Sequence, residues 1–188
     1  MMTIAVALSI VCALLCGGSF SALAKAELKG IGFLIPAVCL RFFLYMQGAA
    51  GAVWVADWAP VLLTLSYGML LYAVYLNREH KGAILFGAGT LANYLVIAVN
   101  GWRMPISREG LLATGQEGMI EYLKGPADYV HGLLTEDTKL AVLADIFYLP
   151  EPFPRPTVFS IGDVFIISGV FLLIFTMMAA KLPRSLSR

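Results

Sequence analysis

A single cation interrupts the second long apolar run of this chain. Arg41 lies near the middle of that run, which contains no acidic residue. If the run crosses a bilayer as a helix, insertion scales place the cost of this charge at roughly 2.5–3.5 kcal/mol. The guanidinium then needs a carboxylate, a wet cavity or the head group of a ligand. Glu27, Asp163 and the carbonyls of broken helices are candidate structural partners, and ligand binding is the alternative role.

Four more polar residues lie near the end of the fourth apolar run and the start of the last one. Asp163 follows Ser160-Ile161-Gly162, so its carboxylate either caps the entry of a helix or faces a polar pocket. Asn93 and Asn100 are seven residues apart, which places both amides on one helix face. An amide in hydrocarbon usually bonds to a neighbouring helix, so helix association is the simpler interpretation. With Arg103 and Asp163, the two amides could instead line an outward-facing site.

The sequence carries no strong pattern of the common enzyme classes. Ser107 and Ser160 have no histidine in an obvious supporting position. The segment Gly115-Gln116-Glu117-Gly118 is too short for a dinucleotide- or phosphate-binding loop. All three cysteines lie in apolar runs, where a neutral thiol packs and reacts slowly. We therefore expect no metal and no cofactor, and an enzyme is the less favoured class.

The composition indicates that water is not the solvent for most of the surface. Hydrophobic residues make up 60% of the 188 residues and charged residues 13%, against roughly 25% charged in an ordinary soluble domain. The mean hydropathy is +0.82. The net charge is +1 and the 13 basic residues are scattered, which excludes a nucleic-acid-binding surface from our expectations. The class predicted is an all-α membrane protein.

Five stretches approach the ~20 apolar residues that a helix needs to cross a bilayer. The first 24 residues end in Ala22-Leu23-Ala24, which has the small-x-small form of a signal cleavage site. No basic residue precedes Lys25, so we expect this first segment to be retained. The predicted spans are residues 2–20, 31–50, 59–76, 82–100 and 158–180.

The basic residues beside the spans predict the topology, since Lys and Arg are retained on the cytoplasmic side. The turn at 51–58 has no basic residue, and the long segment 101–157 has eight acidic and five basic residues. This pattern predicts an outside N-terminus and a cytoplasmic C-terminus. His80 and His131 then lie on opposite sides of the membrane, so no shared metal site is expected. The basic residues that follow the first, third and fifth spans are Lys25, Lys29, Arg78, Lys81, Lys181, Arg184 and Arg188.

The segment between the fourth and fifth spans is the one large extramembrane part, and it is too long for a structureless connection. Thr114 and Glu117 match a capping box, which predicts a helix that ends at Gly125. A second helix is expected to begin at Thr135. The four prolines between 150 and 156 predict a stiff extended lead into the last span. The resulting domains are a four-span region at 1–100, an extracytoplasmic helical cap with its proline-rich lead at 101–157, and a fifth span with a basic tail at 158–188.

Three sequence elements in the C-terminal half resemble one known family. They are Asn100-Gly101-Trp102-Arg103-Met104-Pro105-Ile106-Ser107, Thr138-Lys139-Leu140-Ala141-Val142-Leu143-Ala144-Asp145-Ile146 and Val158-Phe159-Ser160-Ile161-Gly162-Asp163. The chain resembles a family of small uncharacterised bacterial membrane proteins known only as a domain of unknown function. There, an Asn-Gly-x-x-Met-Pro element ends one span and a Phe-Ser-x-Gly-Asp element opens the last. The resemblance implies a location in the bacterial inner membrane and supplies no reaction.

The family elements all fall where the external segment enters or leaves the membrane. A charge-paired latch of Arg103, Asp145 and Asp163 would dock that segment on the bundle without any substrate, and a ligand site at the same place is the alternative. The leading hypothesis is a non-enzymatic accessory subunit of a membrane complex. The alternatives are a binder or carrier of a lipid or isoprenoid, and a membrane-embedded enzyme acting on a lipid-linked substrate. The expected partners are membrane lipid, other subunits or further copies of this chain, and no nucleic acid.

Overall fold

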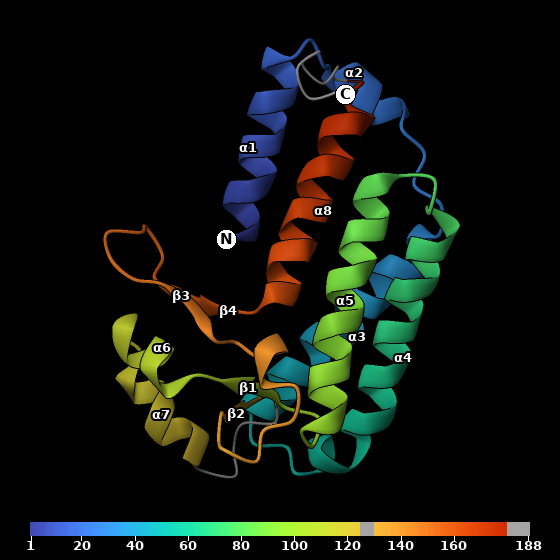
Figure 1. Cartoon of the computed structure of the whole chain (residues 1–188). Coiled ribbons are helices and arrows are strands. Elements are labelled where there is room, and N and C mark those ends of the chain that lie inside the picture. The colour runs from blue at the N-terminus through green and yellow to red at the C-terminus, as the bar shows by residue number, and fades with distance from the viewer. Residues whose placement is uncertain (125–129, 180–188) are drawn as a thin grey trace.

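The computed structural model describes residues 1–124 and 130–179 and shows a row of long helices with a smaller mixed segment at one end (Figure 1). The last helix of the chain, α8, lies between the first, α1, and α5. α5 also packs on α4, which in turn packs on α3. The row therefore runs α1, α8, α5, α4, α3. The bounds are α1 Met2–Leu15, α2 Phe20–Lys25, α3 Ile31–Ala49, α4 Trp54–Leu76, α5 Lys81–Val99 and α8 Ile161–Met177.

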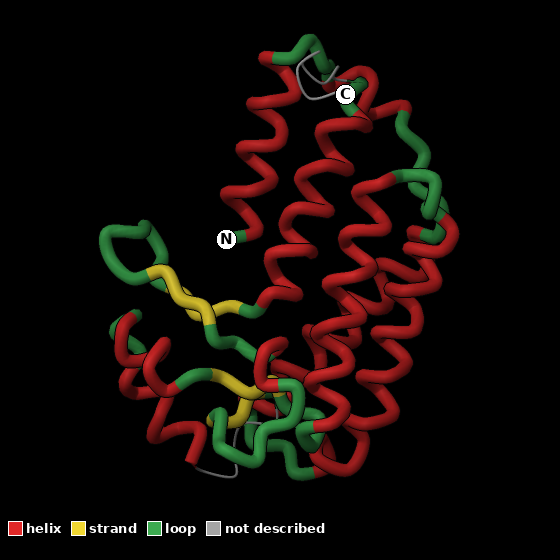
Figure 2. Tube along the Cα trace, viewed as in Figure 1, coloured by secondary structure: helices red, strands yellow, loops and turns green. Residues whose placement is uncertain are grey.

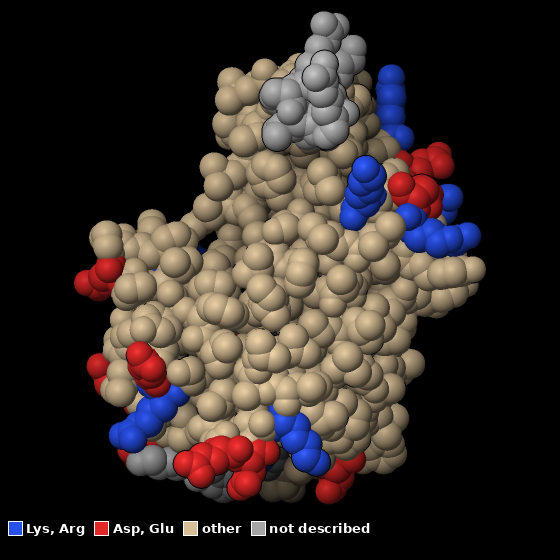
Figure 3. All heavy atoms as spheres, viewed as in Figure 1, with Lys and Arg blue, Asp and Glu red and all other residues tan. Residues whose placement is uncertain are grey.

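Within residues 1–124 and 130–179, three helices are long and apolar enough to cross a membrane. They are formed by Ile31–Gly48, Trp54–Leu76 and Lys81–Val99. α1 and α8 are equally apolar but have 14 and 17 residues, and at 1.5 Å per residue they extend about 21 and 26 Å. Charged side chains gather toward the two ends of the molecule and leave a broad face between them without charge (Figure 3). The described part of the protein is thus mostly helical with three candidate spans, which correspond to the second, third and fourth predicted ones. The first and fifth spans and the topology stay predictions.

The closest helix contact lies between α5 and α8, and glycine makes it possible. A Cβ atom on Gly169 of α8 would lie 2.7 Å from the Gly82 carbonyl oxygen and 2.8 Å from the Cα of Phe86. Two turns further along α5, a Cβ on Gly89 would meet the backbone of Gly162 and Ile166. The two backbones therefore touch at both glycine pairs, as small residues allow in membrane helix interfaces.

The segment between α5 and α8, named the external segment after its predicted location, contains four short strands as well as helices among its described residues. The expectation of an all-α protein was therefore wrong in this part. Strands β1 and β2 pair in parallel, and β3 and β4 pair antiparallel (Figure 2). α6 and α7 pack on each other and bury an apolar cluster that includes Ile106, Leu111 and Ile120. The bounds are β1 Met104–Ile106, α6 Arg108–Ala113, α7 Glu117–Lys124, β2 His131–Leu133, a 3-10 turn η1 Ala141–Leu143, β3 Phe147–Leu149 and β4 Thr157–Phe159.

Two expectations for the external segment fail for identifiable reasons. No helix begins at Thr135, because the Thr138 hydroxyl accepts a bond from the Thr135 amide at 2.9 Å and Leu140 takes a left-handed conformation with φ of 51°. The prolines do not form an extended lead. They lie in the loop of the β3–β4 hairpin, where Leu149 opposes Thr157.

The first predicted cap helix is confirmed as α7, but its predicted cap is not used as expected. The Thr114 hydroxyl donates to the Gly110 carbonyl at 2.8 Å and so stays bonded to α6. The Gln116 amide donates in turn to Thr114 at 2.9 Å. The predicted helix stop at Gly125 and the basic tail with Lys181, Arg184 and Arg188 lie outside the described residues.

The glycine contact predicts a large effect at Gly169 and a small one at Gly68. Gly169→Leu would force α5 and α8 apart, and overpacking of this kind costs typically about 1–3 kcal/mol. Gly68→Leu is the matched control, because nothing lies within 4 Å of a Cβ at that position of α4. We expect the melting temperature in detergent to be several degrees lower for Gly169→Leu than for the parent protein. The melting temperature of Gly68→Leu should be nearly unchanged. Equal melting temperatures for the two variants would contradict the contact.

Candidate functional site

A closed hydrogen-bond network joins α5 to the start of α8. The Asn93 amide Nδ2 donates to Asp163 Oδ1 at 2.9 Å, and Asn93 Oδ1 accepts from the Ser160 hydroxyl at 3.0 Å. Ser160 also accepts from the Asp163 amide at 3.0 Å, while Asp163 Oδ2 accepts from the Ser160 amide at 3.0 Å. This pair is a capping box for α8. Asp163 thus caps its helix and bonds to a neighbouring helix at once, which combines the two roles that the sequence suggested.

Asn100 holds a remote loop against the end of α5. Its Nδ2 donates to the Lys139 carbonyl at 2.8 Å, and its Oδ1 accepts from the Lys139 amide at 2.9 Å. The same Nδ2 also donates to the Val96 carbonyl of its own helix at 2.7 Å. The Asn100 side chain therefore satisfies both backbone groups of Lys139, as a neighbouring strand would. Asn93 and Asn100 do not share a single site: the first bonds to α8 and the second to the external segment.

Asp145 is a buried carboxylate held by its backbone. Its amide donates to the Pro105 carbonyl and its carbonyl accepts from the Ser107 amide, each at 2.9 Å, so residue 145 pairs with β1. The side chain is 8% exposed, and its Oδ1 has no hydrogen-bond partner among the described residues. Burial and, to a smaller degree, the charge of Asp163 raise the pKa of Asp145 from 3.8 to about 7, and His131 opposes the rise. A carboxyl in this setting is easily protonated near neutral pH.

Arg41 lies over an aromatic ring rather than beside a carboxylate. Its guanidinium carbon is 4.5 Å from the centre of the Tyr67 ring, which is 1% exposed. The one salt bridge among the described residues joins Lys29 to Glu79 and does not include Arg41. The Tyr67 hydroxyl makes no well-formed hydrogen bond within the described part; Arg41 acts on it most strongly, followed by Asp163 and Asp145. A cation–π contact of this kind contributes roughly 0.5–2 kcal/mol, less than the cost of a charge in hydrocarbon.

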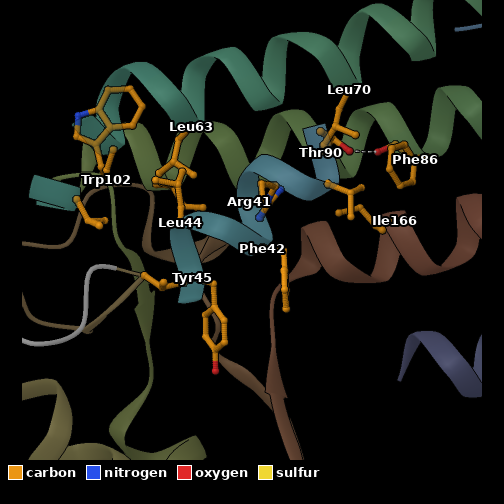
Figure 4. Close-up of a pocket in the computed structure, with 15 residues that line it drawn as sticks. Arg41, Phe42, Leu44, Tyr45, Leu63, Leu70, Phe86, Thr90, Trp102 and Ile166 are labelled. Atoms are coloured by element: carbon orange, nitrogen blue, oxygen red, sulfur yellow. Dashed lines mark hydrogen bonds between the residues drawn. The ribbon is translucent and has the colours of Figure 1, made fainter. Parts of the chain in front are cut away.

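Arg41 borders a pocket of about 470 Å³ between the helices. Figure 4 shows Arg41 between the Trp102 end of this pocket and the end formed by Leu70 and Phe86. The volume is in the range of ligand sites, roughly 300–1,000 Å³. Among the described lining residues Arg41 carries the one charge, and the walls come from six places in the chain, one of them Val130. They include Val38 and Arg41 of α3, Leu63 of α4, Thr90 of α5, Trp102 after α5 and Ile166 of α8.

Arg103 lies on a different cavity. It lines a space of about 330 Å³ together with Asn100, Asp137 and Thr138. Of the three residues of the predicted latch, Asp145 and Asp163 interact electrostatically, and Arg103 lines the cavity beside the loop that Asn100 holds. The latch itself stays a prediction. The six residues singled out from the sequence thus fall into three groups, a helix-capping network, a clamped external loop and a pocket with Arg41.

Tyr67 and Tyr45 were missed in the sequence. Tyr67 receives the Arg41 guanidinium, and Tyr45 lines the pocket one helical turn after Arg41. A signal existed for Tyr45, since residues four apart on a helix share a face. Tyr67 had none, because a tyrosine in an apolar run is an ordinary packing residue.

These observations define a helical protein with apolar helices that suit a membrane and a pocket among them that contains one arginine. The chain belongs to the family of unknown function DUF5317, whose model matches residues 25–175. It is also similar to an uncharacterized protein of Thermotoga maritima, with 29% identity over 129 residues, which are 69% of this chain and 71% of that protein. No solved structure matches the chain. The match to an uncharacterised family confirms the resemblance found in the sequence.

The Asn93–Ser160–Asp163 network predicts a graded loss of stability. Asp163→Ala removes both acceptor oxygens and leaves the Ser160 backbone amide and the Asn93 Nδ2 without an acceptor, which costs about 1–3 kcal/mol for each unsatisfied group. Asp163→Asn keeps one acceptor oxygen and should lie between Asp163→Ala and the parent. The measurement is thermal unfolding in detergent at one pH. If Asp163→Asn were as destabilised as Asp163→Ala, the oxygen that asparagine retains would have no role as an acceptor.

Asp145 predicts a pH dependence of stability. Its pKa is raised on folding, so the folded protein binds the proton more tightly, and the stabilisation is fully present below pH 3.8 and lost as the pH rises through about 7. Asp145→Asn cannot ionise and should lose this dependence. We expect the variant to gain stability relative to the parent between pH 5 and pH 8, as measured by melting temperature. Parallel curves for the two proteins would show that Asp145 does not titrate in this window.

Proposed function

We propose that this protein binds an amphiphile within the membrane, with the apolar tail in the pocket between α3 and α8 and an anionic group against Arg41. The observation that carries the proposal is the position of Arg41 on an apolar cavity without a salt bridge to a described carboxylate. A charge in this position is stabilised by an oppositely charged ligand group that takes the place of water. The bacterial inner membrane, predicted from the family resemblance, is the proposed location.

The walls of the pocket favour a flexible apolar tail. Val55 is 2% exposed and Ala59 is 4% exposed on the α4 side, so this wall is well packed. The Thr90 hydroxyl donates to the Phe86 carbonyl at 2.8 Å and therefore offers little to a polar ligand. The opposite wall is Phe42, which is 64% exposed on α3. A lipid chain or isoprenoid would cover these apolar surfaces, whereas a small polar solute would gain nothing from them.

The accessory-subunit hypothesis stays a prediction that copurification from native membranes tests, and no described feature points to a reaction. The pocket supports binding more directly, because it joins apolar walls and a charge within one cavity. Binding also explains Arg41 without a protein partner.

Arg41→Gln tests this function against a closely matched control. Arg78 lies over the Tyr75 ring at 4.4 Å, in almost the same contact as Arg41 over Tyr67, but at the turn after α4 and away from the pocket. Arg41→Gln should reduce copurifying anionic amphiphile at least roughly tenfold, which corresponds to 1.4 kcal/mol, and Arg78→Gln should retain it. The measurement is native mass spectrometry after gentle extraction, with lipid extraction and identification. Equal retention by the two variants would overturn the proposal.

A further inference from the structure

A second cavity continues from the first toward the external segment. Its volume is about 580 Å³, and it lies between the outer part of α3 and the start and middle of α7. Tyr45 and Val130 line both cavities, which makes the two spaces neighbours with a shared wall. Figure 4 shows the Tyr45 hydroxyl pointing away from the labelled residues of the first pocket.

The two cavities differ in their lining side chains. The first has apolar walls and one cation, and the second includes several neutral polar side chains. On α3 the lining residues follow in the order Val38, Arg41 and Tyr45, and the step from Arg41 to Tyr45 is about 6 Å along the helix axis. Apolar walls lie on both sides of the cation, toward Phe86 and toward Trp102, and the second cavity begins at the wall formed by Tyr45. A molecule that enters both would therefore present an apolar tail, then an anionic group, and then a further polar part.

The polar groups of the second cavity are mostly neutral. Its described lining includes Gln116, Tyr122 and His131 and contains no Asp, Glu, Lys or Arg. The hydroxyls of Tyr45 and Tyr122 bond to no described residue. The Gln116 amide is oriented by its bond to Thr114 at 2.9 Å, and no described residue bonds to its oxygen. Such a wall offers hydroxyls, an amide and aromatic rings, and it offers no carboxylate to an amine.

We propose that the second cavity holds a neutral polyhydroxyl group, so that the ligand is a lipid phosphodiester carrying a sugar or another polyol. This inference rests on the proposed function, because the phosphate is assigned to Arg41. A lipid phosphate without a head group would leave the second cavity to water, and an amino head group would lack a counter-charge there. The neutral donors and acceptors suit hydroxyl groups, which both donate and accept.

Two lipids with the same charge and the same acyl chains test the inference. Phosphatidylinositol carries a polyol on its phosphate, and phosphatidylethanol carries an ethyl group instead. We expect the purified full-length protein in nanodiscs to prefer phosphatidylinositol at least roughly tenfold in competition followed by native mass spectrometry. The double variant Tyr45→Phe/Tyr122→Phe should bring the preference to within about twofold.

The control variant is Tyr148→Phe, which removes a hydroxyl from the external segment outside this cavity, where it donates to Glu109 at 3.3 Å. It should keep the full preference. Equal binding of the two lipids by the parent protein, or a preference that survives in the double variant, overturns the polyol inference. If the polyol inference fails, Arg41→Gln still tests the amphiphile proposal. Loss of both lipids in this variant supports the amphiphile proposal, and retention of both lipids overturns it.

Discussion

The backbone contact between α5 and α8 is the interaction on which the rest of the structure depends. Because Gly89 and Gly162 carry no side chain, the two helices approach closely enough for Asn93 to reach both Ser160 and Asp163. The last helix of the chain is thereby fixed between α1 and α5. The external segment begins just after α5 and ends just before α8, so this contact also fixes both of its ends.

The external segment is anchored through the backbone more than through charge. Asn100 satisfies the amide and the carbonyl of Lys139, and β1 satisfies those of Asp145. Because the backbone around Asp145 is pinned, its carboxylate is carried into a buried place beside Asp163 and Tyr67. The raised pKa of this carboxyl is a consequence of the docking geometry, since burial is its largest cause.

Arg41 imposes the other constraint. Its guanidinium lies over the Tyr67 ring and borders the pocket, and it forms no salt bridge with a described carboxylate. A helix bundle without function would be more stable with an apolar residue there, because the charge contributes little packing and costs insertion energy. The cation among apolar walls and the neutral polar side chains of the neighbouring cavity would suit the parts of one amphiphilic molecule.

The long helices could be predicted from the sequence because their signal is local. A run of about twenty apolar residues indicates a membrane helix wherever it lies, and three of the predicted runs contain helices of sufficient length. The Ser160–Asp163 capping box was equally accessible, since its two residues are three positions apart. The importance of Asn93, Asn100 and Asp145 could be suggested from residue type and position, but their partners could not.

Those partners were decided by the tertiary structure alone. Asn93 bonds to Asp163 across 70 positions and Asn100 to Lys139 across 39, and no local pattern encodes such distances. The helix expected at Thr135 was lost for the same reason, because the clamp on Lys139 and the β3–β4 pairing satisfy backbone groups that a helix would have used. The sequence by itself determined which segments are apolar helices and that Arg41 is costly there. Packing determined which groups meet, because a hydrogen bond between distant segments depends on where the whole chain places both of them.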